Sequence, residues 1–263
     1  MEEANKKHHF VLVHGACQGA WCWYKVKPRL EEAGHRVTVM DLAGSGIDVT
    51  RTIKDVNTCV EYSDPLIKIL GSSPPSEKVV LVGHSFGGMS LAIASEKFPD
   101  KISVSVYLTA FMPDTKNPPS FVIDKILSNM PEESWMGTKF ERYGHDKTGI
   151  SMLYSPELMK KKLYKLCPVE DLELALSLLR PGSLFTNALS KMEKFSEKGY
   201  GSVRRVFIMC KGAKAMAEEQ QRWIIENSGA SEVIEMEDTG HMAMICKPRQ
   251  VSAHLLEIAD KYA

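Results

Sequence analysis

Short apolar runs alternate with longer amphipathic segments through the first part of the chain. A continuous β-branched run such as Val79–Val82 is typical of a strand that is buried on both faces of a parallel sheet. By the same criterion we predict further strands at Phe10–Val13, Val37–Met40 and Ile102–Leu108. The segments between them have helical periodicity and predict helices at Trp21–Glu32, from about Ile53 to Leu70, and at Gly87–Lys97.

The alternation returns near the end of the chain. Apolar runs predict strands at Val203–Met209 and Val233–Met236, and helical periodicity predicts helices at Glu218–Asn227 and Pro248–Tyr262. Strands that alternate with helices in this way imply a doubly wound, mostly parallel sheet with right-handed crossovers. The predicted fold class is therefore α/β.

The middle of the chain has a different pattern. From about Pro113 to Ser183 it holds helical fragments that contain Pro and Met, and no convincing core strand. We predict a helical cap, residues 113–185, inserted over the carboxyl edge of the sheet, where α/β proteins bind ligands. Residues 1–112 and 186–263 then form the core domain.

Composition narrows the class of protein. The chain has 263 residues, of which 44% are hydrophobic and 25% are charged, as in an ordinary globular domain. Lys plus Arg and Asp plus Glu both total 33, so no net charge attracts nucleic acid or an anionic membrane. We expect neither partner, and the composition leaves a homodimer open.

The start of the chain and the cysteines indicate the compartment. Residues Met1–Lys7 are polar, with no apolar signal region, and no later run is long enough to span a bilayer. The six cysteines form no CxxC pair and no Cys/His cluster with metal-ligand spacing. We therefore expect free buried thiols, no metal site and a cytoplasmic location.

The segment Gly83–Gly87 matches G-x-S-x-G, the turn that exposes a nucleophilic serine between a strand and a helix. The motif is common by chance, but here a predicted buried strand precedes it and a helix of small residues follows it. Ser85 is the predicted nucleophile. The alternative is a serine that merely caps the helix in an ordinary strand-to-helix turn.

Two further segments fit the active site of an α/β-hydrolase with a serine nucleophile. The loop after the first strand, with Gly15 and Ala16, is placed to supply one amide of an oxyanion hole, and Phe86 would supply the other. His241 follows the last predicted strand, where the catalytic base of such a hydrolase lies. The alternatives are an ordinary strand-terminating turn and a simple loop histidine.

The third member of the expected triad is missing. A carboxylate should follow the strand at Val203–Met209, but residues Cys210–Lys214 include no Asp or Glu. Asp238, on the His241 loop, is the first candidate for a surrogate acid, and Glu237 and Glu218 are weaker ones. As an alternative, Asp238 is a solvated loop residue.

Taken together, the motifs resemble those of the plant methylesterase family, which includes salicylate-binding esterases, alkaloid-processing esterases and α/β-fold hydroxynitrile lyases. The matching segments are His9–Cys17, Gly19–Trp21, Gly83–Met89, Phe111–Asp114, Arg180–Phe185, Gly201–Val203, Arg222–Trp223 and His241–Met244. The resemblance implies an α/β-hydrolase fold and a serine esterase that needs no cofactor. It implies Ser85 as nucleophile, His241 as base, and Ala16 and Phe86 as oxyanion donors.

The resemblance also shows where this chain departs from the family. The family aspartate corresponds to Ala213, and the position before it to Gly212. The lyases carry Thr and Lys where this chain has Gly15 and Met242, so cyanohydrin cleavage is disfavoured. Phe86 and the Arg180–Phe185 segment are more similar to the alkaloid-processing esterases.

The predicted substrate is a compact neutral methyl ester, because apolar residues surround the expected pocket and no Lys or Arg is obviously placed to bind a carboxylate. The predicted pocket residues are Gly15, Trp135, Met152, Leu153, Tyr154, Leu184 and Met242. The alternative for the cap residues is packing within the cap. An alkaloid ester is the first expectation and a phytohormone ester the second, and the freed acid can decarboxylate. The competing hypothesis is a non-hydrolytic scaffold that binds or rearranges its ligand.

Overall fold

A parallel sheet of six strands, in the order β2-β1-β3-β4-β8-β9, forms the centre of the molecule. The computed structural model describes residues 7–128, 130–144 and 147–263; the polar start of the chain, residues 1–6, lies outside them. The strands are β1 (His9–Val13), β2 (Arg36–Val39), β3 (Val79–His84), β4 (Ile102–Leu108), β8 (Arg205–Cys210) and β9 (Glu232–Met236). The predicted strands and the α/β fold class are confirmed.

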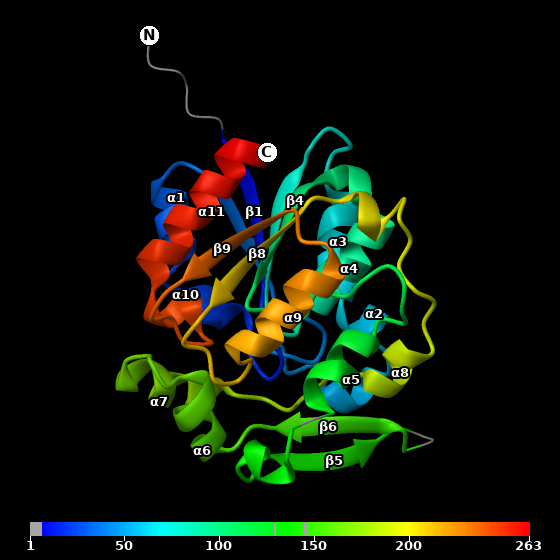
Figure 1. Cartoon of the computed structure of the whole chain (residues 1–263), viewed down its shortest axis with the longest axis vertical. Coiled ribbons are helices and arrows are strands. Elements are labelled where there is room, and N and C mark those ends of the chain that lie inside the picture. Colours follow the sequence, from blue (N-terminus) through cyan, green and yellow to red (C-terminus); the bar gives the residue numbers. More distant parts are fainter. Residues whose placement is uncertain (1–6, 129, 145–146) are drawn as a thin grey trace.

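Alternate residues of the central strands pack into two cores, one on each face of the sheet. Leu12 and Val82 point into a core with helices α1 (Lys27–Glu32) and α11 (Pro248–Tyr262). Their neighbours pack on the other face against α3 (Asp64–Ser72), α4 (Gly87–Lys97) and α9 (Glu218–Ser228). Figure 1 shows this three-layer arrangement, in which helices cover both faces of the sheet. Burial on both faces explains why these strands are almost wholly apolar.

Several predicted helices are shorter or broken in the structure. The segment predicted as one helix from Trp21 consists of a 3-10 turn, η1 (Ala20–Trp23), followed by α1, which begins beside Pro28. The stretch from Ile53 divides into η2 (Ile53–Asp55), α2 (Cys59–Tyr62) and α3. Thr52 and Thr58 each cap a new helix start, and these side-chain caps interrupt a pattern that remains amphipathic throughout. The remaining short core elements are η3 (Pro99–Lys101), η6 (Tyr200–Ser202), α8 (Thr186–Ser190) and α10 (Ala243–Cys246).

The cap contains strands, which the prediction of a purely helical cap missed. An antiparallel sheet joins β5 (Lys139–Tyr143), β6 (Gly149–Leu153) and β7 (Gly182–Ser183). Most of β5 is exposed, so its sequence has no apolar run that marks a buried strand. The cap helices are α5 (Phe121–Leu127), η4 (Glu132–Trp135), α6 (Pro156–Leu158), η5 (Met159–Leu163) and α7 (Val169–Leu178). In Figure 1 the cap lies across one end of the sheet, below α9 and α2.

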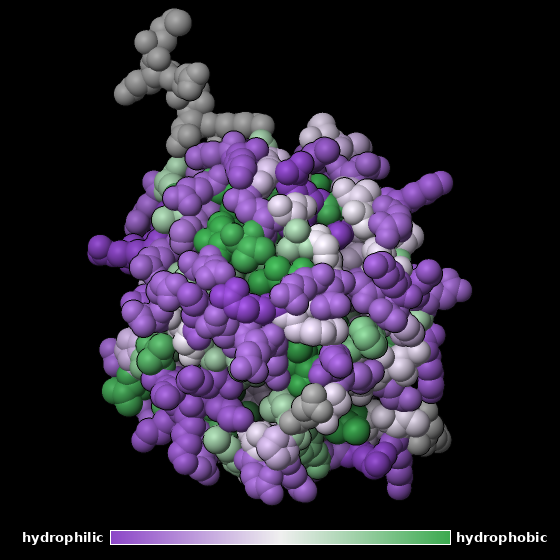
Figure 2. Space-filling view, viewed as in Figure 1, coloured by the Kyte–Doolittle hydropathy of each residue, from purple (hydrophilic) through white to green (hydrophobic). Residues whose placement is uncertain are grey.

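The cysteines differ in their exposure to solvent. All six cysteines are free thiols, but Cys167 and Cys246 are partly exposed, so the expectation that all are buried is wrong for these two. Among the residues that the structure describes, no helix is long and apolar enough to cross a membrane. Hydrophilic residues cover most of the face shown in Figure 2, and a contiguous apolar group is exposed among them in the upper half of the view.

Candidate active site

The predicted catalytic loops meet where the strand order of the sheet changes direction. Strand β1 lies between β2 and β3, so the loops that follow β1 and β3 leave the same edge side by side. In open α/β sheets this position forms a crevice at the carboxyl ends of the strands. Ala16 and Ser85 come from these two loops, so the fold alone brings the predicted oxyanion donor to the predicted nucleophile.

Ser85 occupies a strained turn between β3 and α4. Its φ of 52° lies in the left-handed region, which is uncommon for a residue other than glycine. The turn is held by hydrogen bonds from the Gly88 and Phe111 amides to the Ser85 carbonyl, at 3.2 and 3.0 Å. At Gly87 a Cβ would lie 2.5 Å from the His14 carbonyl oxygen, so only glycine permits this close approach. The geometry is that of a nucleophile elbow.

His241 faces Ser85, the predicted nucleophile. Its Nε2 lies 3.2 Å from the Ser85 hydroxyl oxygen, and the side chain is only 3% exposed. Its backbone carbonyl accepts a hydrogen bond from His84 Nε2 at 2.9 Å, which ties the histidine loop to the elbow. The residue inside the motif, His84, therefore holds His241 in place, and burial together with the neighbouring His241 holds the pKa of His84 well below its ordinary value. The predicted serine and histidine are brought together.

Among the residues that the structure describes, no carboxylate orients the other nitrogen of His241. Nδ1 is buried and has no hydrogen-bond partner in the described part of the chain. Asp238 is exposed on the loop and makes no contact with the ring, so it does not fill the surrogate role. Glu237 pairs with Lys211 at 2.6 Å, and Glu218 pairs with Arg222 at 2.7 Å. The structure therefore supports none of the three surrogate acids suggested by the sequence.

The loop after β8 nevertheless lies next to the histidine loop. Ala213 is 2% exposed, and its amide donates to the Cys210 carbonyl at 3.1 Å, which closes a turn. A Cβ on Gly212 would lie 3.0 Å from the carbonyl oxygen of Thr239, two residues before His241. The turn that follows β8 therefore packs against the histidine loop, and no side chain from Lys211 to Ala213 is able to accept the proton of His241 Nδ1.

The two predicted oxyanion donors have free amides. Neither the Ala16 nor the Phe86 N–H donates to another group in the part of the chain that the structure describes. Both residues are almost fully buried, at 4% and 0% exposure. A Cβ on Gly15 would lie 3.0 Å from Ser85 Cβ, so glycine lets this loop approach the nucleophile. Unpaired buried amides are rare unless a ligand or water uses them, which fits an oxyanion hole.

A pocket beside Ser85 and His241 has a cavity volume of about 60 Å³. Three predicted residues line it: Trp135, Tyr154 and Leu184. Met242 is fully buried in the core, and neither Leu153 nor Gly15 is in the lining, so these three predicted residues do not line the pocket. The sequence did not single out the other lining residues, which are Phe111, Leu127, Met130, Leu158, Lys162, Leu163, Ala215 and Met216.

The sequence positions of some of these residues could have indicated that they line the pocket. Phe111 follows β4, and Ala215 and Met216 follow β8, so all three come from loops at the carboxyl edge of the sheet. Leu158 and Lys162 are four residues apart in α6 and η5, a spacing that places both on one face. Lys162 is a basic residue in the lining, whereas the sequence indicated no Lys or Arg obviously placed there to bind a carboxylate.

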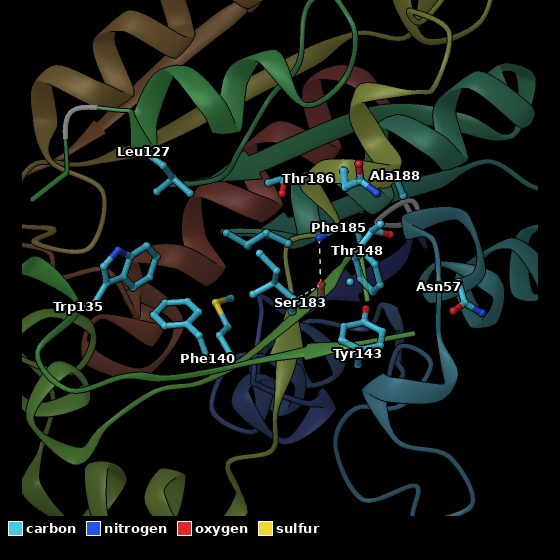
Figure 3. A pocket seen from close by; sticks show the side chains of 15 residues that line it. Asn57, Leu127, Trp135, Phe140, Tyr143, Thr148, Ser183, Phe185, Thr186 and Ala188 are labelled. Atoms are coloured by element: carbon cyan, nitrogen blue, oxygen red, sulfur yellow. Dashed lines mark hydrogen bonds between the residues drawn. The ribbon is translucent and has the colours of Figure 1, made fainter. Parts of the chain in front are cut away.

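A second cavity, of about 280 Å³, adjoins the catalytic pocket. Leu127, Trp135 and Leu184 line both, and Figure 3 shows Leu127 and Trp135 at one end of the second cavity. Its far end carries polar groups, including Asn57 and Tyr143. Met152, predicted as a pocket residue, lines this cavity. Together the two volumes suit a small organic molecule.

The pH dependence of hydrolysis should follow His241. Burial lowers the pKa of its imidazole to about 4, so the imidazole is neutral above that pH and is able to accept a proton. We expect kcat/KM to fall only as the pH drops through about 4 and to be level at neutral pH. Initial rates at constant ionic strength, with folding checked by circular dichroism, would measure this. An acidic limb near the ordinary histidine pKa, about 6.5, would contradict it.

Comparison with known proteins places this geometry in a family. Residues 10–253 match the model of the alpha/beta hydrolase family. Methylesterase 1 of Arabidopsis thaliana is 66% identical over 262 residues, covering 100% of both chains. Salicylic acid-binding protein 2 of Nicotiana tabacum is 50% identical, covering 97% of this chain and 98% of its own. The crystal structure of polyneuridine aldehyde esterase, a protein known from Rauvolfia serpentina, is 46% identical with a TM-score of 0.94, covering 97% of this chain and 100% of that one.

Proposed function

The chain belongs to the plant methylesterase family of α/β-hydrolases, and from that premise we propose that it hydrolyses the methyl ester of a small plant metabolite with a serine–histidine pair. The single observation that carries the proposal is the contact of His241 Nε2 with the Ser85 hydroxyl, 3.2 Å long, inside a buried pocket. A serine and a histidine in this relation are the minimum needed for acyl transfer.

In the proposed reaction, the Ser85 oxygen attacks the ester carbonyl while His241 Nε2 takes the serine proton. The Ala16 and Phe86 amides donate hydrogen bonds to the oxygen that becomes negative. Methanol leaves with the proton from His241, and an acyl group remains on Ser85. Water then attacks the acyl group, again with His241 as base, and releases the free acid.

Without a carboxylate to orient His241, we expect the serine–histidine pair to catalyse hydrolysis slowly. In well-studied serine hydrolases, loss of the acid alone lowers kcat by about 10⁴-fold, because the histidine tautomer is no longer fixed. His241 Nδ1 has no partner among the described residues, and its low pKa makes it a poor acceptor of the serine proton. We therefore propose slow turnover, with Ala213 in the position that an acid fills in the family.

The proposed substrate is an ester of a compact, largely apolar acid. The pocket walls formed by Trp135, Tyr154 and Leu184 support this, because aromatic and aliphatic groups make up most of the surface that a ligand would contact. Likeness to polyneuridine aldehyde esterase supports an alkaloid ester as one candidate. Likeness to salicylic acid-binding protein 2 supports an ester of a small aromatic acid, such as a phytohormone, as the other. Decarboxylation of the released acid remains part of the first candidate.

The second proposed function is a scaffold that binds or rearranges its ligand without an acyl-enzyme. The unpartnered Nδ1 of His241 favours it, because a weak, buried base suits a simple proton transfer more than a full hydrolytic cycle. For either function we propose a cytoplasmic location, which the six free thiols support.

A fluorophosphonate probe separates the two functions, because it labels only a serine that is activated as a nucleophile. We expect labelling of Ser85, located by peptide mass spectrometry, together with measurable release of methanol from a panel of methyl esters. Ser85→Ala is the control for both signals. Absence of labelling and of methanol release, in a protein shown to be folded, would overturn the hydrolytic proposal.

A further inference from the structure

Cys167 of the cap and Cys246 of the core form a pair of thiols outside the lining of the catalytic pocket. Their side chains share a hydrogen bond. The Met242 carbonyl accepts from the Cys167 thiol at 3.9 Å and from the Cys246 amide at 3.0 Å, so one backbone group holds both residues. Cys246 ends α10, which follows the loop of His241. The pair therefore connects the cap to the histidine loop.

The cap segment that carries Cys167 packs closely on the catalytic loops. A Cβ on Gly240 would lie 3.3 Å from the Leu166 Cβ and 3.8 Å from the Cys246 sulfur. A Cβ on Gly212 would lie 3.1 Å from Leu166 Cδ1. Because both loop residues are glycines, the segment settles directly onto the two loops. The contact between the two thiols is therefore part of the packing of the cap on the core.

Only noncovalent contacts hold this segment of the cap to the core among the residues that the structure describes. The Tyr164 hydroxyl donates to Gln18 Oε1 at 3.2 Å, and Asp171 pairs with Lys25 at 2.5 Å. Contacts of this kind break and re-form readily when a cap moves. A covalent bond between the two cysteines would change how firmly the segment is held.

The two paired thiols are also the accessible ones. The other four cysteines are buried: Cys17, Cys22, Cys59 and Cys210. Burial raises the pKa of all four thiols, which disfavours the reactive thiolate. Cys167 and Cys246 are partly exposed, and Cys167 lines a surface hollow of about 560 Å³. Their shared hydrogen bond lowers the pKa of Cys246 and raises that of Cys167, so Cys246 is the more readily ionised of the two.

We propose that Cys167 and Cys246 are an oxidation site, at which a peroxide forms a disulfide that joins the cap to the histidine loop. The Cys246 thiolate attacks one oxygen of hydrogen peroxide, the O–O bond breaks, and the hydroxide that leaves takes up a proton to become water. The Cys167 sulfur then attacks the sulfur of the Cys246 sulfenic acid. The S–S bond forms and the S–O bond breaks, and the Cys167 proton leaves with the hydroxyl group as a second water. The two thiols thereby supply the two electrons that reduce the peroxide.

The disulfide would hold one wall of the catalytic pocket in place. Leu158 and Leu163 of the cap line the pocket shortly before Cys167 in the chain, and His241 lines it shortly before Cys246. A ligand that displaces this part of the cap on its way in would then enter more slowly. In a reducing compartment such a bond forms transiently, which suits redox control. Formation of the disulfide is independent of the proposed function, whereas its effect on hydrolysis rests on it.

Thiol counting and peptide mapping of the whole protein test the oxidation site. After hydrogen peroxide, alkylation in denaturant should find two of the six thiols lost, and mass spectrometry should find one Cys167–Cys246 cross-link that dithiothreitol reverses. The four buried cysteines are internal controls and should remain thiols. Cys246→Ser should prevent the loss of Cys167, and Cys167→Ser should leave a Cys246 sulfenic acid that dimedone traps. Six remaining thiols, a link to another cysteine, or a bond only between two molecules would overturn the proposal.

Thermal unfolding and hydrogen exchange test whether the bond fastens the cap. The disulfide closes a loop of about 80 residues, so we expect the oxidised protein to unfold at a Tm higher by about 5 °C or more. Amide exchange in residues 156–178 should slow on oxidation, and neither change should occur in Cys246→Ser. A cross-linked protein with the Tm and exchange of the reduced one would contradict the proposal.

Hydrolysis of one methyl ester by the reduced and oxidised proteins tests the effect on ligand entry. We expect kcat/KM to fall on oxidation and to recover with dithiothreitol, and to stay constant in Cys246→Ser. An equal kcat/KM in the reduced and the fully cross-linked protein would rule out control of ligand entry by the disulfide. Failure of the reduced protein to hydrolyse the ester counts against the proposed function alone, because the thiol count and the Tm do not depend on turnover.

Discussion

Ala213→Asp is expected to raise kcat for methyl ester hydrolysis about a thousandfold. The new carboxylate would lie in the turn after β8, which packs against the histidine loop through Gly212 and Thr239. There it would accept the proton of His241 Nδ1, which has no partner among the described residues. The bond fixes the tautomer that leaves Nε2 free as a base and stabilises the imidazolium formed during attack.

The expected gain is smaller than the factor of about 10⁴ that a native acid supplies. Ala213 is 2% exposed, so the larger side chain has to displace its packed neighbours, which lowers the expected gain. Its charge should also raise the pKa of His241 from about 4 toward the ordinary value, because an opposite charge favours the imidazolium. The acidic limb of the rate profile should therefore move to higher pH along with the gain in kcat.

Ala213→Asn is the matched control for this experiment. It has nearly the same shape as aspartate but no charge, so it fills the space without stabilising the imidazolium. Rates on p-nitrophenyl acetate and on methyl esters, with thermal unfolding of each variant, distinguish an effect on catalysis from an effect on stability. If the aspartate variant and the unaltered protein hydrolyse at the same rate, a group other than residue 213 already orients His241.

The core of the fold and the contact between Ser85 and His241 were predictable from sequence, because the first depends on local pattern and the second on a local motif and on chain order. Strand β4 and helix α4 begin and end where the apolar run and the helical period do. Ser85 was identified because its turn needs small neighbours on both sides, and Gly87 shows why. His241 followed from chain order. Short motifs and the order of elements along the chain can be read from the sequence alone, so no knowledge of the tertiary structure is needed to find these residues.

The cap and the pocket walls were predicted less well because they depend on which side chains face inward. Strand β5 is mostly exposed and pairs through its backbone, which leaves no apolar signature. Met242 follows His241 in sequence, yet its side chain packs into the core that contains residues of α1 and α11. Lys162 belongs to a basic run that looks solvated, and only the packing of η5 turns it to the pocket.

Ser85→Ala should lower kcat by very different factors in the unaltered protein and in the Ala213→Asp variant. In the unaltered protein, Ser85→Ala should lower kcat by on the order of 10²-fold, because the members of a triad act as a unit and the site already lacks one of them. In Ala213→Asp the same substitution should cost about 10⁵-fold, since it then destroys a complete triad. The two variants that lack Ser85 should have the same residual kcat, which depends on the oxyanion amides and on substrate binding.

The four proteins of this cycle, measured on one methyl ester, show whether residue 213 acts through the nucleophile. A cost of Ser85→Ala that is the same in both backgrounds would mean that the aspartate raises the rate by some route other than orienting His241 toward Ser85. A serine substitution without effect in the unaltered protein would mean that its residual hydrolysis does not pass through an acyl-enzyme, which favours the non-hydrolytic scaffold. Strong coupling, with the cost rising about a thousandfold between backgrounds, would show that the elbow, the base and the oxyanion amides remain assembled and that the acid alone is missing.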